Sequence, residues 1–478
     1  MLSPNQVLTP RQKALQINLN KNIYGTFSEI GAGQETVRYF FRAGAASKTI
    51  AKAISAYDKE FSDSIYGKEP DNRYVSQTRL IKMLDHEINL IEDRIDRTNC
   101  PGRKFFSYAN TVTTINFNKT FKGHGWVGIR FQLHESESYN EIILHIRFHE
   151  NDAKLQQETL GILGVNLIYG AFFYSDDPKK IINSLYDELS TDQLEIDMIN
   201  FSGPGYTHVD NRLMSLQLVK NGMSDAVVFE PNGKNVLPAD ELYKKNIFAL
   251  RGSFRPVTNV NIDMCNQGLK MFKKEKNVNN HNTKVLFEIT LSNLRAAGEI
   301  NEQDFLDRAD VLGKLGYTVL ISNFSEYFRL VDYFSRFSTE KIGISMGVNN
   351  LLDIFEENYY TNLSGGIMEA FGKLFKQQMK IYLYPYIDPE TEKLLNSENL
   401  KVNESLKDLY KYFKKNERIV DIKDYNDSYL KIYGKKILAQ IAMGKSGWED
   451  QIPKEVADMI KERGMFGYSM GTLLTTNQ

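Results

Sequence analysis

The sequence contains little cysteine, and this shortage excludes a scaffold held together by disulfide bonds. Only two of the 478 residues are cysteines, Cys100 and Cys265, and neither stands in a C-x-x-C or zinc-site spacing. Hydrophobic residues make up 42% of the chain and charged residues 25%, as in ordinary globular proteins. Apolar cores, not cross-links, therefore have to stabilise the fold.

Long apolar runs and an excess of one charge are also missing. No stretch of about 18 apolar residues occurs, so we expect no membrane helix and no membrane partner. The amino-terminal segment MLSPNQVLTPRQKALQINLNK is polar and lacks the apolar centre of a secretory signal, which predicts a cytoplasmic or other reducing location. The net charge of −1 predicts no nucleic-acid partner.

The first 150 residues divide into two predicted segments. Small residues are dense over 30–58, and residues 78–96 have the spacing of an amphipathic helix, so residues 1–98 are predicted to be a helical region. Apolar and polar residues alternate over 104–118, 126–134 and 142–150. Residues 99–150 are therefore predicted to form an antiparallel β meander with one face toward solvent.

Residues 151–390 alternate between short apolar runs and amphipathic stretches, which predicts an α/β domain with a largely parallel sheet. The expected strands are 165–172, 193–200, 225–229, 247–251, 284–289, 318–322, 342–346 and 380–384. Eight units fit either an open, Rossmann-like doubly wound sheet or a closed (β/α)8 barrel. The loop after residue 251 favours the open sheet. Residues 391–478 are predicted to be a helical region with a tail.

The segment 246–274 is the best candidate for a ligand site. It combines an apolar strand, the loop GSFRPVTN and a helix that begins near Asn259. Free backbone N–H groups and the positive end of the helix dipole meet at such a junction, which favours an anionic, usually phosphorylated, ligand. Gly252 and Ser253 are predicted to contact phosphate through their backbone, and Arg251 and Arg255 flank the loop.

This loop resembles the first signature of the nucleotidyltransferase family, whose nicotinate and nicotinamide nucleotide adenylyltransferases carry Gly-Ser-Phe-x-Pro-x-Thr-Asn-x-His. The matching residues are Gly252, Ser253, Phe254, Pro256, Thr258 and Asn259. Asn261 stands where the family has its histidine. The segments YGTFSEIGAGQE and SGPGYTHVDNRLMSLQLV are also similar to a bacterial family of comparable length that is often named nicotinate-nucleotide adenylyltransferase.

The resemblance implies transfer of an adenylyl group from ATP, with Mg²⁺, to a nicotinate-type mononucleotide in NAD biosynthesis. Such a reaction depends on stabilising charge along an in-line path, and Asn261 brings no positive charge. The implied catalytic residues are Thr258, Asn261 and Arg255. The implied cofactor-binding residues are Arg251, Gly252, Ser253 and Asn259. The residues by themselves predict binding of a nucleotide or another phosphorylated metabolite.

Polar residues after other predicted strands form a candidate substrate pocket. Its members are Ser202, Asp210, Arg212, Glu230 and Glu288. Ligands of α/β proteins bind outside the carboxyl ends of the strands, so we expect these side chains on one rim. Each of them alone also suits a structural role, and Asp210 suits the first turn of a following helix.

Histidines gather in the third strand of the predicted meander. His145 and His149 alternate with Arg147 on its solvent face, and His134 ends the neighbouring strand. Residues four apart on a strand are separated by about 13 Å, which is too far for them to share a metal ion. The pattern predicts a polar sheet face or a subunit contact, and no metal site.

Two other functions stay open at this point. One is a non-catalytic, self-assembling scaffold, a homo-oligomer in which the loop motif is vestigial. Near-zero net charge, 26 tyrosines and open meander edges favour it. The other is a barrel enzyme that uses Asp210, Glu230 and Glu288 as acid and base groups.

Overall fold

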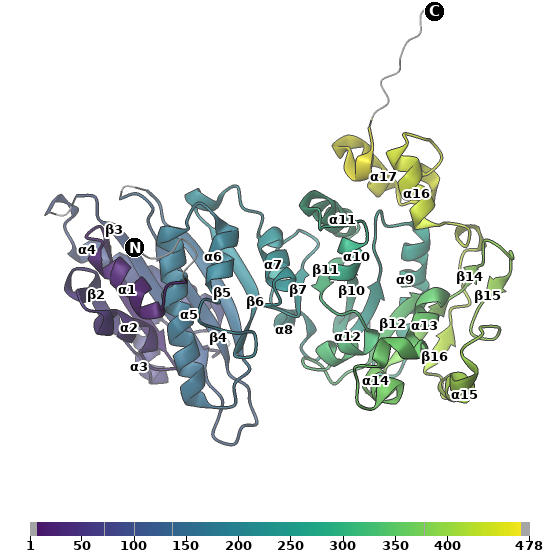
Figure 1. Ribbon diagram of the computed structural model, residues 1–478, viewed down its shortest axis with the longest axis horizontal. Coiled ribbons are helices and arrows are strands. Elements are labelled where there is room, and N and C mark those ends of the chain that lie inside the picture. The colour runs from purple at the N-terminus through teal and green to yellow at the C-terminus, as the bar shows by residue number, and fades with distance from the viewer. Residues whose placement is uncertain (1–6, 71, 100, 136, 377, 470–478) are drawn as a thin grey trace, which may run out of the picture. The chain divides into compact units, whose positions relative to one another are not determined.

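The computed structural model describes residues 7–70, 72–99, 101–135, 137–376 and 378–469 (Figure 1). The chain forms two compact units, residues 1–225 and 226–478. The segment boundaries expected after residues 98 and 150 both fall inside the first unit, because one sheet takes its strands from all three segments. Cys100 and residues 470–478 of the expected tail lie outside the described residues.

The first unit is built on a six-stranded mixed sheet with the strand order β2-β1-β3-β4-β5-β6. The strands are β1 (Ile23–Ile30), β2 (Ile50–Ile54), β3 (Lys104–Thr113), β4 (His124–Phe131), β5 (Asn140–Phe148) and β6 (Leu194–Ser202). β1 is parallel to β2 and β3, whereas β3 to β6 are antiparallel neighbours. The predicted meander is confirmed as β3–β5. β1 and β2 lie in the region that was expected to be helical.

Helices cover both faces of this sheet. They are α1 (Pro10–Leu19), α2 (Glu35–Ala43), α3 (Lys59–Tyr66), α4 (Gln77–Arg94), α5 (Ala153–Phe173), α6 (Pro178–Ser184) and α7 (Asn211–Lys220). Neighbouring residues of β3 point to opposite faces of the sheet. The Ser107 hydroxyl donates to the Leu84 carbonyl of α4 on one face. Tyr108 packs in the apolar core under α5 on the other face. The prediction that one meander face is open to solvent is therefore wrong where α4 packs, on β3 and β4.

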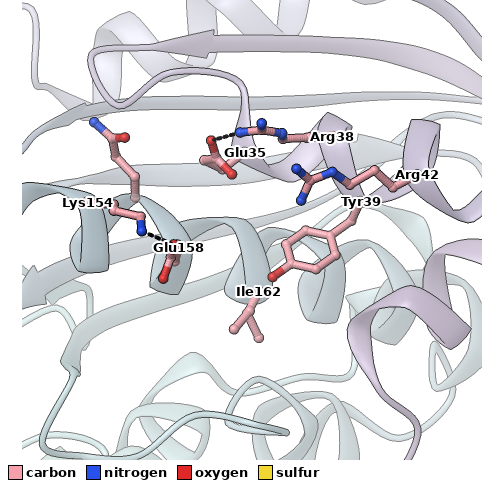
Figure 2. Close-up of a pocket in the computed structure, with 8 residues that line it drawn as sticks. Glu35, Arg38, Tyr39, Arg42, Lys154, Glu158 and Ile162 are labelled. Carbon is pink, nitrogen blue, oxygen red and sulfur yellow. Dashed lines mark hydrogen bonds and ion pairs between the residues drawn. The ribbon is translucent and has the colours of Figure 1, made fainter.

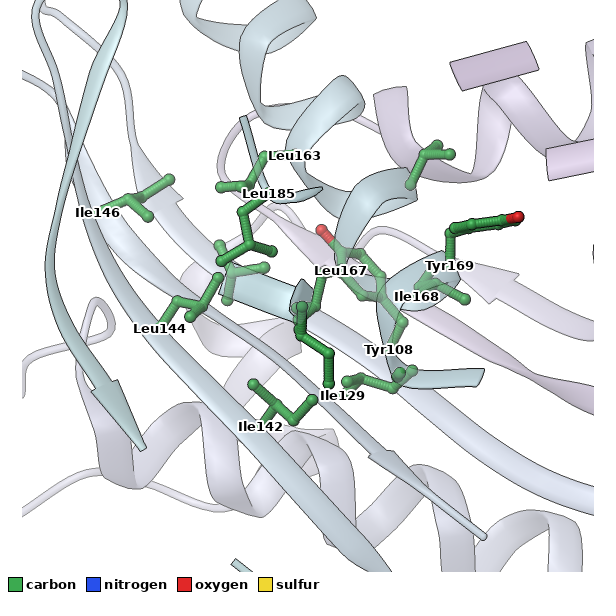
Figure 3. Packing of buried hydrophobic residues seen from close by; sticks show 14 of the residues in the cluster. Tyr108, Ile129, Ile142, Leu144, Ile146, Leu163, Leu167, Ile168, Tyr169 and Leu185 are labelled. Carbon is green, nitrogen blue, oxygen red and sulfur yellow. The ribbon is translucent and has the colours of Figure 1, made fainter. Parts of the chain in front are cut away.

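Helix α5 replaces the strand that was predicted at 165–172. The Asp152 carboxylate caps its amino terminus, accepting from the N–H groups of Lys154 and Leu155 at 2.8 and 3.1 Å. Most of the helix is buried, so apolar residues appear on all of its sides and no helical period is visible in the sequence. Its side chains pack with those of the strands in the core (Figure 3). A buried run of this kind does not distinguish helix from strand.

A buried carboxyl links β1 to α2. Glu29, near the end of β1, accepts hydrogen bonds from the backbone N–H groups of Thr36 and Val37 at 3.2 and 2.9 Å. The Asn110 amide of β3 donates to the same carboxylate at 3.2 Å. Glu29 therefore occupies the amino-terminal end of α2 from inside the protein.

The second unit contains an eight-stranded sheet with the order β16-β13-β12-β9-β10-β11-β7-β8. The strands are β7 (Ala226–Phe229), β8 (Asn235–Val236), β9 (Asn246–Arg251), β10 (Thr283–Thr290), β11 (Thr318–Ser322), β12 (Ile342–Gly347), β13 (Lys380–Tyr384) and β16 (Ile419–Asp421). Six of them are parallel, and β7 and β8 form an antiparallel edge.

The strand order identifies the sheet as open and doubly wound. Numbered along the chain from β9, the six parallel strands lie in the order third, second, first, fourth, fifth, sixth, which is the Rossmann order. The prediction of an open Rossmann-like sheet is confirmed. The barrel alternative is wrong, because β16 and β8 are the outer strands of the described sheet and do not pair with each other.

Helices lie on both faces of the second sheet. They are α8 (Pro238–Leu242), α9 (Asn259–Phe272), α10 (Leu291–Arg295), α11 (Glu302–Lys314), α12 (Tyr327–Phe334), α13 (Val348–Ile354), α14 (Gly366–Leu374), α15 (Lys407–Lys415), α16 (Gly434–Ala442) and α17 (Lys454–Arg463). Along β9, Phe248 packs on Phe272 of α9, while Ile247 and Ala249 join the core under α12–α14. Among the described helices, none is long and apolar enough to cross a membrane.

Candidate functional site

The predicted loop lies where the winding of the second sheet reverses. β9 is the first strand of the Rossmann order, and the chain returns to place β12 on its other side. Residues 252–258 connect β9 to α9, and Gly347 connects β12 to α13. The carboxyl ends of β9 and β12 are thus adjacent, and such a reversal is where open α/β sheets bind their ligands.

Two apolar side chains anchor the loop from beneath. Phe254 is buried, and its ring centroid lies 5.1 Å from that of Phe287 on β10. Val257 is also buried, whereas Ser253 is exposed. The backbone of Phe254 adopts a left-handed conformation with φ of 45°, which turns its ring into the core. The apolar residues of the motif hold the loop in place and leave Ser253 facing solvent.

Thr258 and Asn261, two predicted catalytic residues, bond to each other. Thr258 is the N-cap residue of α9, and the Asn261 side-chain oxygen accepts from its backbone N–H at 3.0 Å and from its hydroxyl at 2.9 Å. The side-chain amide of Asn259 donates to the Asp450 carbonyl at 3.0 Å. The side chain at the position of the family's histidine therefore helps to cap the helix.

Arg251, which was predicted to bind phosphate, forms an ion pair with a buried carboxylate of the sheet. Its Nε and Nη2 atoms donate to the two oxygens of Glu288 at 2.8 and 2.9 Å, and Nη1 donates to the Ser325 carbonyl at 3.0 Å. The side chains are 7% and 0% exposed. Burial opposes the charge of Arg251, but the carboxylate and its hydrogen bonds raise the pKa of the guanidinium above its usual value. The Ser322 hydroxyl donates to Glu288 at 2.6 Å.

Arg255, the second predicted clamp, shares a carboxylate with another arginine. Its Nε donates to Asp304 of α11 at 2.5 Å, and Arg308, one turn further along α11, pairs with the other oxygen of Asp304. Nη1 of Arg308 also donates to the Ser253 carbonyl at 3.2 Å. Arg255 and Arg308 thus share one carboxylate on this side of the loop.

An aromatic side chain lies beside the ion pair of Arg251. The Arg251 guanidinium lies 4.3 Å from the ring centroid of Tyr327, at the start of α12. The Tyr327 hydroxyl accepts from the Asn350 amide of α13 at 3.0 Å. Burial, opposed in part by the charge of Arg251, raises the pKa of Tyr327 to about 12. The phenol is therefore a neutral neighbour of the ion pair and not a base.

The five predicted pocket residues divide between the two units. Ser202, Asp210 and Arg212 belong to the first unit, and Glu230 and Glu288 belong to the second. Asp210 caps α7, as its alternative role implied, and accepts from the Arg212 N–H at 2.9 Å and from its guanidinium at 2.7 Å. Because of these contacts, the Asp210 pKa is lowered despite burial of the carboxyl.

Glu230 and Glu288 lie at opposite ends of the strands of the second sheet. The expectation of a common rim assumed that all strands were parallel, but β7 is antiparallel to β11 and pairs Phe229 with Val319. The carboxyl end of β7 therefore lies at the amino-terminal edge of the parallel strands, away from the loop after β9. Strand direction, which a residue pattern does not contain, separates the two glutamates.

A groove of about 510 Å³ lies elsewhere, between α2 and α5 of the first unit (Figure 2). Its lining residues are Glu35, Arg38, Tyr39, Arg42, Lys154, Gln157, Glu158 and Ile162. Ion pairs join Arg38 to Glu35 at 2.9 Å and Lys154 to Glu158 at 3.6 Å. Residues of α2 and α5 form this groove, and none of the predicted site residues lines it. We therefore place the candidate site at the loop after β9.

The sequence did not predict which residues of other elements contact the loop and its arginines. Asp304 and Arg308 are spaced four apart on α11, a visible helical pair, but their contact with residues about 50 positions earlier in the chain is not visible in the sequence. Tyr327 and Asn350 were missed for the same reason. Among the described residues, no group of three or more histidine, cysteine, aspartate or glutamate side chains could hold a metal ion.

Comparisons with known proteins identify no family for this chain. No family model and no curated protein matches it. Matches to solved structures include a competence-damaged protein (CinA) superfamily protein from Enterobacter cloacae, with 12% identity over 35% of this chain and 95% of that one, at a TM-score of 0.26. A competence or damage-inducible protein from Enterobacter asburiae matches with 15% identity over 34% and 98%, also at 0.26.

A third match is the competence/damage inducible protein CihA from Agrobacterium tumefaciens, with 12% identity over 34% of this chain and 97% of that one, at a TM-score of 0.24. Similarities at such TM-scores support no conclusion about fold or function.

Proposed function

We propose that the second unit binds a nucleotide or another phosphorylated metabolite at the carboxyl edge between β9 and β12. The supporting observation is the place of the GSFRPVTN loop, which follows the first strand of a Rossmann-ordered sheet at its reversal point. The exposed Ser253 and the first turn of α9 offer polar contacts there, and the dipole of the 14-residue helix favours negative charge.

Binding is favoured over adenylyl transfer by the state of the loop's charged side chains. Transfer requires positive charge along the reacting phosphates. Arg251 forms an ion pair with Glu288, and Arg255 forms one with Asp304. The Asn261 side chain bonds to Thr258 in the cap of α9. Glu288 and Asp304, the carboxylates beside the loop, are held by guanidinium groups, so the residues here do not fit a ready Mg²⁺ site.

Calorimetric titration of the full chain tests the proposal. ATP, ADP and nicotinate mononucleotide are the ligands, with adenosine as the phosphate-free control. We expect at least one phosphorylated ligand to bind and adenosine not to bind. Ser253→Asp, which adds negative charge at the exposed loop position, is expected to weaken binding roughly tenfold, or about 1.4 kcal/mol.

Ser47→Asp is the matched control, because Ser47 is also an exposed serine but lies in the first unit. Equal affinities of the two variants, or heats no larger than those of buffer for every phosphorylated ligand, would contradict the proposed site. Chromatography after incubation with ATP, Mg²⁺ and nicotinate mononucleotide separates binding from transfer. A dinucleotide product would show that the paired arginines are released during a reaction.

A further inference from the structure

A chain of three polar side chains crosses the antiparallel strands of the first unit. Nδ1 of His124 on β4 lies 3.2 Å from Nε2 of His145 on β5, and Nδ1 of His145 lies 2.5 Å from a carboxylate oxygen of Asp197 on β6. Nε of Arg147 donates to the other oxygen of Asp197 at 2.8 Å. The inner part is buried, with His145 1% and Asp197 3% exposed.

The hydrogen bonds fix the tautomers of both histidines. The hydrogen bond from His145 and the charge and hydrogen bond of Arg147 hold the pKa of the Asp197 carboxyl below its usual value despite burial, so Asp197 is ionised and accepts from Nδ1–H of His145. In the neutral ring of His145, Nε2 then accepts from Nδ1–H of His124. In the neutral ring of His124, this leaves the lone pair on Nε2, on the side away from His145.

The surroundings keep His124 uncharged and partly accessible. Burial, followed by the neighbouring His145 and the charge of Arg147, lowers the pKa of His124 to about 4, although Asp197 acts in the opposite direction. His124 retains partial exposure, and the ring of Phe121, itself 46% exposed, lies 5.7 Å from it. Trp126 packs on the inner His145 at 4.9 Å. The inner ring is fixed, and the outer ring reaches solvent.

This arrangement has the form of an activated nucleophile. In a catalytic triad, a carboxylate orients a histidine, and the histidine takes the proton of the attacking group. Here Asp197 orients His145, and His124 occupies the place of the attacking group. Arg147 is the direct cross-strand partner of His124, so a guanidinium lies next to the ring where a developing negative charge would be stabilised.

We propose that His124 is a phosphoryl-accepting nucleophile in a site of the first unit that is independent of the loop after β9. The Nε2 lone pair forms a bond to phosphorus, and the bond from phosphorus to the leaving group of an energy-rich phosphoryl donor breaks, with its electron pair leaving on that group. The Nδ1 proton of His124 passes to Nε2 of His145, whose positive charge Asp197 compensates. Arg147 stabilises the charge of the transferred phosphoryl group.

Phosphoramidate, a small donor that releases ammonia, tests this with the full chain. Mass spectrometry and ³¹P spectroscopy locate the acid-labile phosphoryl group. We expect labelling of His124 ahead of the exposed His208 and His281, although exposure alone would give the opposite order. His124→Gln should abolish this label, and His208→Gln, the matched control, should retain it. Labelling that follows exposure would overturn the proposal.

Asp197→Asn tests the role of the hydrogen bonds that join His124, His145 and Asp197 separately from the accessibility of His124. An asparagine amide donates to Nδ1 of His145, which reverses both hydrogen bonds and places a proton on Nε2 of His124. We expect labelling of His124 to fall on the order of a hundredfold. A variant that retains the wild-type circular dichroism and wild-type labelling would show that the carboxylate has no such role, and would contradict the proposal.

A measurement on the unaltered protein keeps the test independent of how variants fold. Nitrogen-15 spectra should show His124 protonated at Nδ1 and unprotonated at Nε2, and the opposite tautomer would refute the mechanism.

Discussion

At the residue scale, burial decides how individual charged groups behave. Arg251 and Glu288 were predicted to serve a ligand because both stand at strand ends. In the structure they are buried and form a bidentate ion pair, and Ser322 and Ser325 bond to its remaining polar atoms. A buried charge that lacked such a partner would carry a large desolvation cost. The pair is thus a structural link between β9 and β10 beneath the proposed ligand site.

Glu29 provides a pH test at the same scale. Burial raises its pKa to about 7, although hydrogen bonds from Val37, Thr36 and Asn110 act in the opposite direction. An unfolded glutamate has a pKa of about 4.3, so the folded state binds this proton more tightly. The stability that Glu29 contributes is therefore complete below about pH 4 and is lost as the pH rises through about 7.

Glu29→Gln should flatten this dependence, because glutamine resembles the protonated acid. Urea unfolding at intervals between about pH 5 and 8 should show the wild-type free energy of unfolding falling more steeply than that of the variant, by on the order of 3 kcal/mol. Glu195, also buried with a pKa of about 7, remains in both proteins, so the difference between the two curves isolates Glu29. Parallel curves would show that the carboxyl does not titrate in this range.

At the element scale, the cap of α9 gives a structural reason for the residue that departs from the family signature. Asn261→Ala removes the acceptor of the two hydrogen bonds from Thr258, and we expect a loss of about 1 kcal/mol in the free energy of unfolding. Asn261→Asp is the matched control, because a carboxylate accepts the same bonds and favours the positive end of the helix dipole. Equal denaturation midpoints for both variants would contradict the capping role.

The elements that the sequence predicted well are those with a visible length and period. Strands β11 and β13 match the expected ranges 318–322 and 380–384, because each is a short apolar run bounded by polar segments. Helix α5 was missed because burial on all sides removed its period. β2 was missed because it lies among small residues that suggested packed helices. The partners of the loop arginines were not predictable, since they depend on contacts between distant segments.

At the scale of the whole molecule, each unit has a sheet made only from its own strands. We expect residues 1–225 and 226–478 to fold as separate proteins, since each has its own apolar core. Circular dichroism and thermal melting of the two fragments check this, with a cooperative transition expected for each. The fragment 226–478 should also retain the ligand affinity of the full chain. A fragment without a cooperative transition would show that the units depend on each other.

The outer strands of the two sheets differ in length, and this affects how copies of the chain could join. In the described second unit, the outer strands β8 and β16 have only two and three residues, which is too little unpaired backbone to template an incoming strand. In the first unit, β2 and β6 have five and nine residues. Edge-to-edge polymerisation is therefore restricted to the outer strands of the first unit, and β6 offers only part of its length, because Ile196 and Phe201 already bond to Met223 and Asn211.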